Sequence, residues 1–169
     1  MANSIPQAPT ESKKEPKEEW WSAFPSPRAS VPEMTGDELM ELFDGMDMKP
    51  EPRPFLLVDV RRTDWEGGTI RTSLNLAAQS FYQTRKTLLD LCDRANIKTV
   101  IFYCGASNGR GPRCAAWMQD YIDDLTKLVG HKSVLKVRVL KGGIKGWVND
   151  FKGAMMDGFV EEHWEQFKQ

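Results

Sequence analysis

The sequence from Cys104 to Arg110, Cys-Gly-Ala-Ser-Asn-Gly-Arg, combines a thiol and a guanidinium separated by five small or turn-forming residues. A thiolate is a strong nucleophile, and the planar guanidinium can hold two oxygens of a tetrahedral anion. Gly105, Gly109 and Gly111 permit backbone conformations closed to other residues, so successive amide N–H groups can point at one centre. The segment therefore predicts a nucleophile at the base of a cradle that binds an oxyanion.

Two further features of this segment favour a reactive cysteine. Pro112 fits the first turn of a helix, which puts the positive end of the helix dipole under the loop and favours thiolate over thiol at Cys104. Ser107 can donate its hydroxyl to the thiolate, or to the sulfur as it leaves in a second step, and Asn108 is a polar or left-handed turn residue. The alternative is a tight structural turn whose cysteine is merely buried.

The segment lies where a predicted strand meets a predicted helix. Lys98 to Cys104 is a buried strand, and Pro112 to Val129 has the apolar spacing of a long helix. Phe55 to Val60 is another short apolar run, typical of a parallel strand covered on both faces, and Ser133 to Leu140 alternates enough to be a third strand. Ligands of such sheets bind beyond the carboxyl ends of the strands, which is where Cys104 falls.

Helices are predicted between these strands. Thr35 and Glu38 form a capping box that predicts a helix over 36 to 45, and residues 80 to 96 carry apolar side chains at helical spacing. Glycines break the chain before a last short helix around Trp147. The alternation of strands and helices predicts an α/β domain with a central, mostly parallel sheet and right-handed crossovers.

The composition bounds the class of protein. With 169 residues, 40% apolar and 28% charged, the chain fits one soluble globular domain. A formal charge of −1 argues against nucleic-acid binding, and no apolar run approaches the roughly 20 residues of a membrane span. The first residues lack the apolar stretch of a secretory signal, so we expect the protein inside the cell, in the cytoplasm or nucleus. Three reduced cysteines whose spacing with His131 and His163 matches no zinc pattern lead us to expect neither metal nor cofactor.

The two ends of the chain differ in character from its middle. Residues 1–33 hold six of the ten prolines, with disorder expected over 1 to about 19, and the domain is predicted over 34–169. Three aromatic residues of the N-terminal segment are apolar enough to lie against the domain as an extended strap, the alternative being a partner-binding motif: Trp20, Trp21 and Phe24. An apolar stripe near the C-terminus is expected to be core or a capping surface, the alternative being a partner groove: Met155, Met156, Phe159, Val160, Trp164 and Phe167.

The motifs together resemble a known family. The sequence Cys104-x5-Arg followed by Gly-Pro-Arg, with LLVDVRRTDWEGGTI upstream and VLKGGIKGW downstream, is similar over about residues 34 to 152 to the rhodanese-fold phosphatases of the cell-division-cycle (M-phase inducer) type and to the eukaryotic arsenate reductases of that superfamily. The resemblance implies a rhodanese-like α/β fold, with a five-stranded, mostly parallel sheet flanked by helices. It also implies Cys104 as the catalytic nucleophile, and Arg110 with the loop amides as the oxyanion cradle: Gly105, Ala106, Ser107, Asn108 and Gly109. Sulfurtransferases of the family have one residue fewer in this loop, and the longer loop fits phosphate or arsenate.

The chain also departs from the pattern of that family. Tyr103 stands where the family usually has His before the cysteine, and no acid lies between Cys104 and Arg110. Thr69 replaces His in the GGHI segment, and Val60 stands at the position of a back-door cysteine, so that rescue disulfide cannot form.

We predict a cysteine-dependent phosphatase, of the protein tyrosine or dual-specificity type, that forms a thiophosphate on Cys104. Its substrate would be a phosphorylated protein or a small aryl phosphate, since an aryl leaving group needs little protonation. The alternative is arsenate reduction completed by an external thiol such as glutathione with glutaredoxin. A third possibility is a thiosulfate-type sulfurtransferase or a non-catalytic anion-binding domain. No nucleic-acid or membrane partner is expected.

Several other residues are candidates for supporting roles around this loop. Asp59 orients the loop or is a buried structural carboxylate paired with Arg61 or Arg62, and Arg113 is a second cation for the substrate or a surface charge. Asp64 or Glu66 is a candidate proton donor to the leaving group. Cys114 is a buried thiol against the sheet or a resolving thiol for oxidised Cys104. The two histidines are expected on the surface or in loops.

Overall fold

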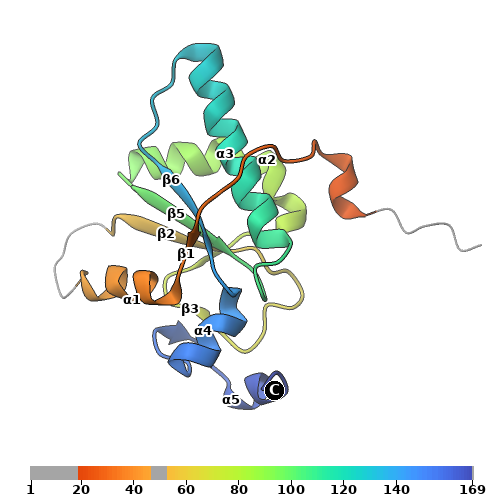
Figure 1. Ribbon diagram of the computed structural model, residues 1–169, viewed down its shortest axis with the longest axis vertical. Coiled ribbons are helices and arrows are strands. Elements are labelled where there is room, and N and C mark those ends of the chain that lie inside the picture. Colours follow the sequence, from red (N-terminus) through yellow and green to blue (C-terminus); the bar gives the residue numbers. More distant parts are fainter. Residues whose placement is uncertain (1–18, 47–52, 169) are drawn as a thin grey trace, which may run out of the picture.

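A computed structural model describes residues 19–46 and 53–168. One sheet of five parallel strands runs through the centre of the molecule (Figure 1). The predicted rhodanese-like architecture is confirmed in its central parallel sheet. In spatial order the strands are β1 (Glu33–Met34), β6 (Lys136–Leu140), β5 (Thr99–Tyr103), β2 (Phe55–Asp59) and β4 (Leu74–Asn75). A separate antiparallel pair joins β3 (Thr69–Ile70) to β7 (Met156–Asp157).

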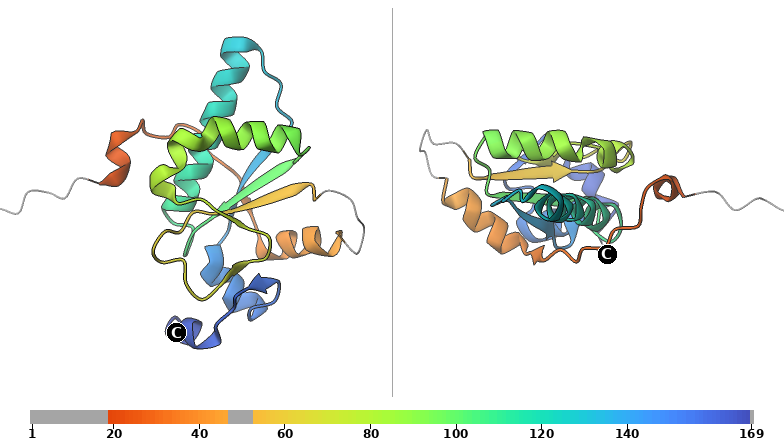
Figure 2. Two further views of the ribbon diagram at one scale, coloured as in Figure 1. Left: turned by 180° about the vertical axis from the view of Figure 1, so that it is seen from behind. Right: turned by 90° about the horizontal axis from the view of Figure 1, so that it is seen from above.

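Helices cover both faces of the sheet (Figure 2). Side chains alternate along β5, so Val100 and Phe102 pack with the helices of one face and Ile101 and Tyr103 with those of the other. The first face is covered by α2 (Ala78–Arg94) and α3 (Arg110–Val129), and the second by α1 (Gly36–Asp44) and α4 (Gly143–Phe151). A short 3-10 helix, η1 (Trp20–Ala23), and α5 (Glu161–Glu165) lie near the two ends.

The predicted elements agree with these bounds except at some ends. The capping box is confirmed, because the Thr35 hydroxyl accepts from the backbone N–H of Glu38 while the Glu38 carboxylate accepts from Thr35 N. Helix α3 begins at Arg110, earlier than the predicted Pro112, so the guanidinium extends from the helix itself. Strand β6 begins only at Lys136. Strands β1 and β4 were not predicted because two residues carry no periodicity.

The ends of the described chain pack onto the domain. Trp20, Trp21 and Phe24 lie against the core on the α3 side, whereas the expected disorder of residues 1 to about 19 concerns a segment that lies almost wholly outside the described residues. In the C-terminal stripe, Met156 and Trp164 are buried in the core on the α4 side, and Met155 and Phe159 pack on that core, while Val160 and Phe167 remain exposed. Among the helices described, none combines the length and hydropathy needed to cross a bilayer.

Candidate active site

Cys104 directly follows β5 and faces the first turn of α3. The backbone N–H of Gly111 donates to its Sγ at 3.4 Å. The cysteine is only 4% exposed, yet it lines a cavity of about 280 Å³, named here the Cys104 hollow. The sulfur therefore meets an N–H group at the positive end of a helix dipole and is reachable from a cavity.

The conformation of the Cys104 loop, residues 104–110, differs from the prediction that glycines carry its unusual backbone. Gly105, Gly109 and Gly111 all lie outside the left-handed region, and Ser107 occupies it instead, with φ of 53°. Gly111 is needed for close approach, because a Cβ there would lie 3.3 Å from the Tyr103 Cα. The prediction was therefore wrong about why glycine occurs at these positions. Gly111 is constrained by the tight contact between α3 and β5, and the local sequence does not reveal a contact between distant segments.

The Ser107 hydroxyl is buried without a partner. The residue is 7% exposed, and its Oγ makes no hydrogen bond within the described part of the chain. A Cβ on Gly111 would lie 3.4 Å from this oxygen, so the hydroxyl sits by the same helical turn that faces Cys104. A buried hydroxyl left unpaired in this way is costly, and such groups cluster where a ligand or reacting group completes them.

Helix α4 holds the loop from the other side. The backbone N–H groups of Ile144 and Lys145 donate to the carbonyls of Cys104 and Gly105, each at 3.0 Å. Gly143 makes this approach possible, because its φ is +60° and a Cβ there would lie 2.5 Å from the Cys104 carbonyl oxygen. Sequence reasoning read these glycines only as a break before a helix, although the GGI signal was visible.

Arg110 is engaged by an acid from another loop. Both arms of its guanidinium donate to the Asp64 carboxylate, at 2.7 and 2.5 Å. The hydrogen bonds from Arg110 hold the pKa of Asp64 well below its usual range, and in return the pair raises the pKa of Arg110. Asp64 is thus an ionised acceptor while it is paired with Arg110, and its role as a proton donor to a leaving group stays a prediction.

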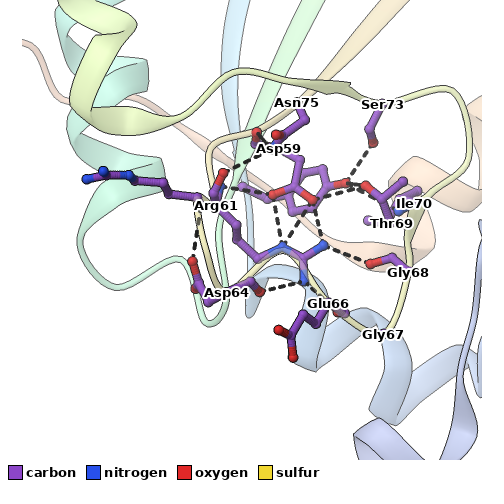
Figure 3. Close-up of polar contacts among 12 residues, drawn as sticks. Asp59, Arg61, Asp64, Glu66, Gly67, Gly68, Thr69, Ile70, Ser73 and Asn75 are labelled. Carbon is purple, nitrogen blue, oxygen red and sulfur yellow. Dashed lines mark hydrogen bonds and ion pairs between the residues drawn. The ribbon is translucent and has the colours of Figure 1, made fainter.

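A buried ion pair holds the loop that carries Asp64 (Figure 3). The Arg61 guanidinium lies 2.7 Å from the Asp59 carboxylate, and both side chains are almost fully buried. Arg61 also donates to the carbonyls of Glu66 and Gly68. The structural reading of Asp59 is confirmed, with Arg61 as its partner.

Tyr103 and Thr69, the two residues that the resemblance marks as departures from the family pattern, contact each other. The hydroxyls of Tyr103 and Thr69 are 2.8 Å apart, and Thr69 donates to Asp59 at 3.0 Å. Tyr103 is also hydrogen-bonded to Ser73 at 2.7 Å and accepts from the Ile70 amide. Burial raises the pKa of Tyr103 above its ordinary value. The phenol is thus committed to this network, which ties β5 to the segment around β3.

The strap completes the Cys104 hollow. The Arg113 guanidinium lies 4.4 Å from the ring centroid of Trp21. Arg113 is therefore not an isolated surface charge, because its guanidinium packs on Trp21 at the edge of this hollow, and its role as a second cation for the substrate stays a prediction. The residues around this hollow are Trp20, Trp21, Cys104, Ala106, Asn108, Gly109, Arg110 and Arg113.

A second hollow of about 480 Å³ lies on the other side of Arg110. His163, expected on the surface or in a loop, lines it from α5 and is half-buried, with its Nδ1 3.9 Å from the Glu66 carboxylate. Lys145 of α4 lines it as well. No local pattern marked either residue, because each reaches this site only through the packing of the C-terminal segment.

The other two cysteines are buried and free. Burial raises the pKa of Cys92 to about 11 and raises that of Cys114 as well. Cys114 is thus buried against the sheet, as the simpler of its two readings has it.

Comparison with known proteins shows which sequences and structures this chain resembles. A family model described as "Rhodanese-like domain" matches residues 35–150. The chain is 32% identical over 95 residues to "Dual specificity phosphatase Cdc25" of Arabidopsis thaliana, covering 54% of this chain and 60% of that protein. It is 39% identical over 49 residues to "Arsenate reductase 2.1" of rice, covering 29% of each. The chain thus spans less than two thirds of these curated relatives.

A solved structure is similar over most of the chain. It is described as a yeast protein tyrosine phosphatase of the Rhodanese family, and it is 26% identical with a TM-score of 0.63. The match covers 81% of this chain and 99% of the yeast chain.

Proposed function

Because this chain belongs to the family of rhodanese-like domains, we propose that it is a cysteine-dependent phosphatase acting through a thiophosphate on Cys104. The observation that carries the proposal is the position of the Cys104 Sγ. This sulfur accepts a hydrogen bond from the Gly111 N–H and lines a hollow that Arg110 also borders. Relatives named as phosphatases support the same reaction class.

The reaction has two displacements. The Cys104 thiolate attacks phosphorus, the bond to the ester oxygen breaks, and the sulfur carries the phosphoryl group. Arg110 exchanges the Asp64 carboxylate for oxygens of the phosphoryl group, and the loop amides of Gly105, Ala106, Ser107, Asn108 and Gly109 donate to the others. Water then attacks phosphorus, and the buried Ser107 hydroxyl donates to the departing sulfur.

The surroundings of Arg110 favour a good leaving group. Asp64 is ionised and paired, and Glu66, which lines the second hollow, lies against His163. The Cys104 loop itself holds no acid between Cys104 and Arg110 that could protonate an alkoxide. We therefore propose an aryl phosphate, free or on a protein, whose phenolate leaves with little protonation or takes the proton of the substrate monoanion.

Arsenate reduction is the second candidate, and the absence of an acid between Cys104 and Arg110 favours it because this reaction expels no alkoxide. The Cys104 thiolate would replace one oxygen of arsenate, which leaves as water. Cys104 and one external thiol, such as glutathione, then supply two electrons, so that arsenite leaves and a mixed disulfide remains. A second thiol, delivered for example by glutaredoxin, reduces that disulfide. A relative named as an arsenate reductase is consistent with this candidate.

The test is a side-by-side assay of aryl phosphate, arsenate with thiols, and thiosulfate with cyanide. We expect phosphate release to dominate, and Cys104→Ser to lower it by about a thousandfold or more. Cys92→Ser, which changes a buried thiol of α2, is the matched control and should keep the activity. Arsenite release alone would replace the first candidate by the second, and turnover that survives Cys104→Ser would contradict both.

A further inference from the structure

We propose that Trp20 and Trp21 form a subsite for the aromatic ring of the phosphoester whose phosphate lies at Cys104. The inference rests on the proposed function and names the part of the molecule that reads the leaving group. Both tryptophans border the same hollow of about 280 Å³ as Cys104 and Arg110. A ring seated against them would belong to the same small molecule or side chain as the phosphate in the cradle.

The tryptophans are held in place by contacts made farther along the strap, residues 20–29. The backbone N–H groups of Arg28 and Ala29 donate to the Asp120 carboxylate at 2.8 and 2.9 Å. The Trp117 indole N–H donates to the Pro25 carbonyl at 2.8 Å. Because these bonds bind the strap to α3 independently of the hollow, its aromatic end is positioned as a wall before any ligand binds.

Aromatic packing adds to this anchoring. Phe24 stacks on Tyr82 of α2 with ring centroids 4.9 Å apart. It also meets Trp117 edge to face at 5.7 Å. These contacts fix the direction in which the strap runs toward the Cys104 hollow. The sequence of the strap alone does not predict that direction.

The two rings offer the surface that an aryl group needs. Trp20 and Trp21 lie nearly perpendicular, at 86°, with centroids 5.4 Å apart, so together they present the faces and edges that aromatic rings pack against. Arg113 over Trp21 adds positive charge beside the path of an anionic ester. Alkyl phosphates lack the flat face that would use this corner.

The partial exposure of Trp20 and Trp21 also fits a surface that binds a ligand. Trp117 and Trp147, which pack the two cores, are each 1% exposed. Trp20 and Trp21 are only half-buried, although apolar residues surround the strap. Apolar surface that remains on the wall of a hollow beside a nucleophile is surface that a substrate ring can cover.

The experiment compares anions with and without a ring. Phenylphosphonate and inorganic phosphate are titrated into the full chain by calorimetry, because the phosphorus–carbon bond is not hydrolysed. We expect Trp21→Ala and Trp20→Ala each to weaken phenylphosphonate binding about three- to tenfold. Both should leave inorganic phosphate within about twofold. Trp21→Phe keeps a ring and should lose less, and Leu128→Ala, at the exposed far end of α3, is the control.

The outcomes separate the possibilities. Equal weakening of both anions would overturn the inference, because the tryptophans would then only support the loop. Tighter binding of both anions would also overturn it, because the tryptophans would then obstruct the site instead of binding the ring. Selective loss of phenylphosphonate without any phosphate-ester turnover would support the ring subsite while removing the proposed phosphatase activity. Selective loss accompanied by turnover of 4-nitrophenyl phosphate or of a phosphotyrosine peptide would support both, and the relative rates identify a free or protein-bound ring.

Discussion

Ser107 combines two uncommon features within the Cys104 loop. Its φ of 53° places a non-glycine residue in the left-handed region, and its buried hydroxyl has no partner within the described residues. Each feature costs free energy in the resting state. A single residue that carries both lies beside the turn that faces Cys104, where the proposed mechanism has its hydroxyl donate to the departing sulfur.

Replacing Ser107 by Gly and by Ala separates these features. Both changes remove the hydroxyl, whereas only Gly relieves the left-handed backbone. We expect both to lower the rate of thiophosphate hydrolysis about ten- to hundredfold, since a hydrogen bond to a charged group contributes about 1.5–3 kcal/mol. Rapid-quench measurement of phosphoenzyme checks this. Full activity in Ser107→Gly would show that only the backbone conformation matters.

Asp64 acts at the same scale as a resident competitor for Arg110. Its carboxylate takes both arms of the guanidinium, where the proposed mechanism places oxygens of the phosphoryl group. We expect Asp64→Asn to tighten binding of inorganic phosphate about two- to fivefold, because the anion no longer displaces an ionised partner. Calorimetry measures the change, and weaker binding in the variant would show that Asp64 instead holds Arg110 in place for the anion.

The pH dependence follows from the lowered pKa of Asp64. A carboxyl whose folded pKa is depressed stabilises the fold above the ordinary aspartate value of about 4, and that contribution is lost only as the pH falls towards the lowered pKa. Asp64 therefore stays ionised between about pH 5 and pH 8. The pH–rate profiles of the parent and of Asp64→Asn should have the same limbs in this window. Loss of one limb of the pH–rate profile in Asp64→Asn would show that Asp64 acts as a proton donor.

At the scale of elements, the start of α4 fixes where the loop carbonyls lie. Two backbone N–H groups of α4 donate hydrogen bonds to the Cys104 and Gly105 carbonyls. These bonds fix the orientation of the two peptide planes that carry those carbonyls. The loop amides then have a defined direction without any side chain of their own. Helix α4 is in this sense part of the site although none of its side chains lies in the Cys104 hollow.

Two left-handed glycines test this role. Gly143→Ala would bring a Cβ 2.5 Å from the Cys104 carbonyl, whereas Gly130, also left-handed with φ of +67°, has no atom within 4 Å of such a Cβ. Both variants should lose about 1–2 kcal/mol from backbone strain. Only Gly143→Ala should lose a further increment and most of the activity. Thermal unfolding and aryl phosphate turnover measure the two effects, and equal activity in both variants would contradict the support from α4.

At the scale of the whole molecule, a buried polar network joins segments that are distant in the chain. Asp59 at the end of β2 binds Arg61 and Thr69 (Figure 3), and the Thr69 hydroxyl lies within hydrogen-bond distance of the Tyr103 hydroxyl of β5. The small β3–β7 sheet continues this connection to the C-terminal segment, whose Trp164 indole donates to the Gly67 carbonyl at 2.7 Å. The position of the loop that carries Asp64 therefore depends on the entire fold.

Removing the charge of Asp59 should destabilise the molecule. Asp59→Asn leaves Arg61 buried without its counter-ion, and breaking such a pair costs about 3–5 kcal/mol. Asp157→Asn is the matched control, because Asp157 pairs with Arg71 on the exposed face of the β3–β7 sheet and should cost about 1 kcal/mol or less. Urea unfolding compares the two variants. Similar losses in both would mean that the buried network adds no specific stability.

The local sequence determined much of the fold and the centre of the site. The apolar runs around Leu57 and Ile101 predicted buried parallel strands, and the capping box at Thr35 predicted the start of α1, because these signals depend on neighbours in the chain. The spacing from Cys104 to Arg110 similarly placed the proposed nucleophile and cradle residues on one strand-to-helix loop. Two-residue strands lay beyond this reasoning, since they exist only through pairing with distant partners.

Tertiary structure alone decided what surrounds that loop. Asp64 is 46 positions from Arg110, and Trp21 meets Arg113 from the N-terminal segment of the chain. Gly143 likewise matters only because α4 approaches the Cys104 carbonyl. Side-chain types and periodicity report the preferences of each segment, whereas ion pairing, ring contacts and close backbone approach depend on which segments the packed core brings together. The proposed nucleophile could therefore be predicted from the sequence, whereas its surroundings, Asp64, Trp21 and Gly143, could not.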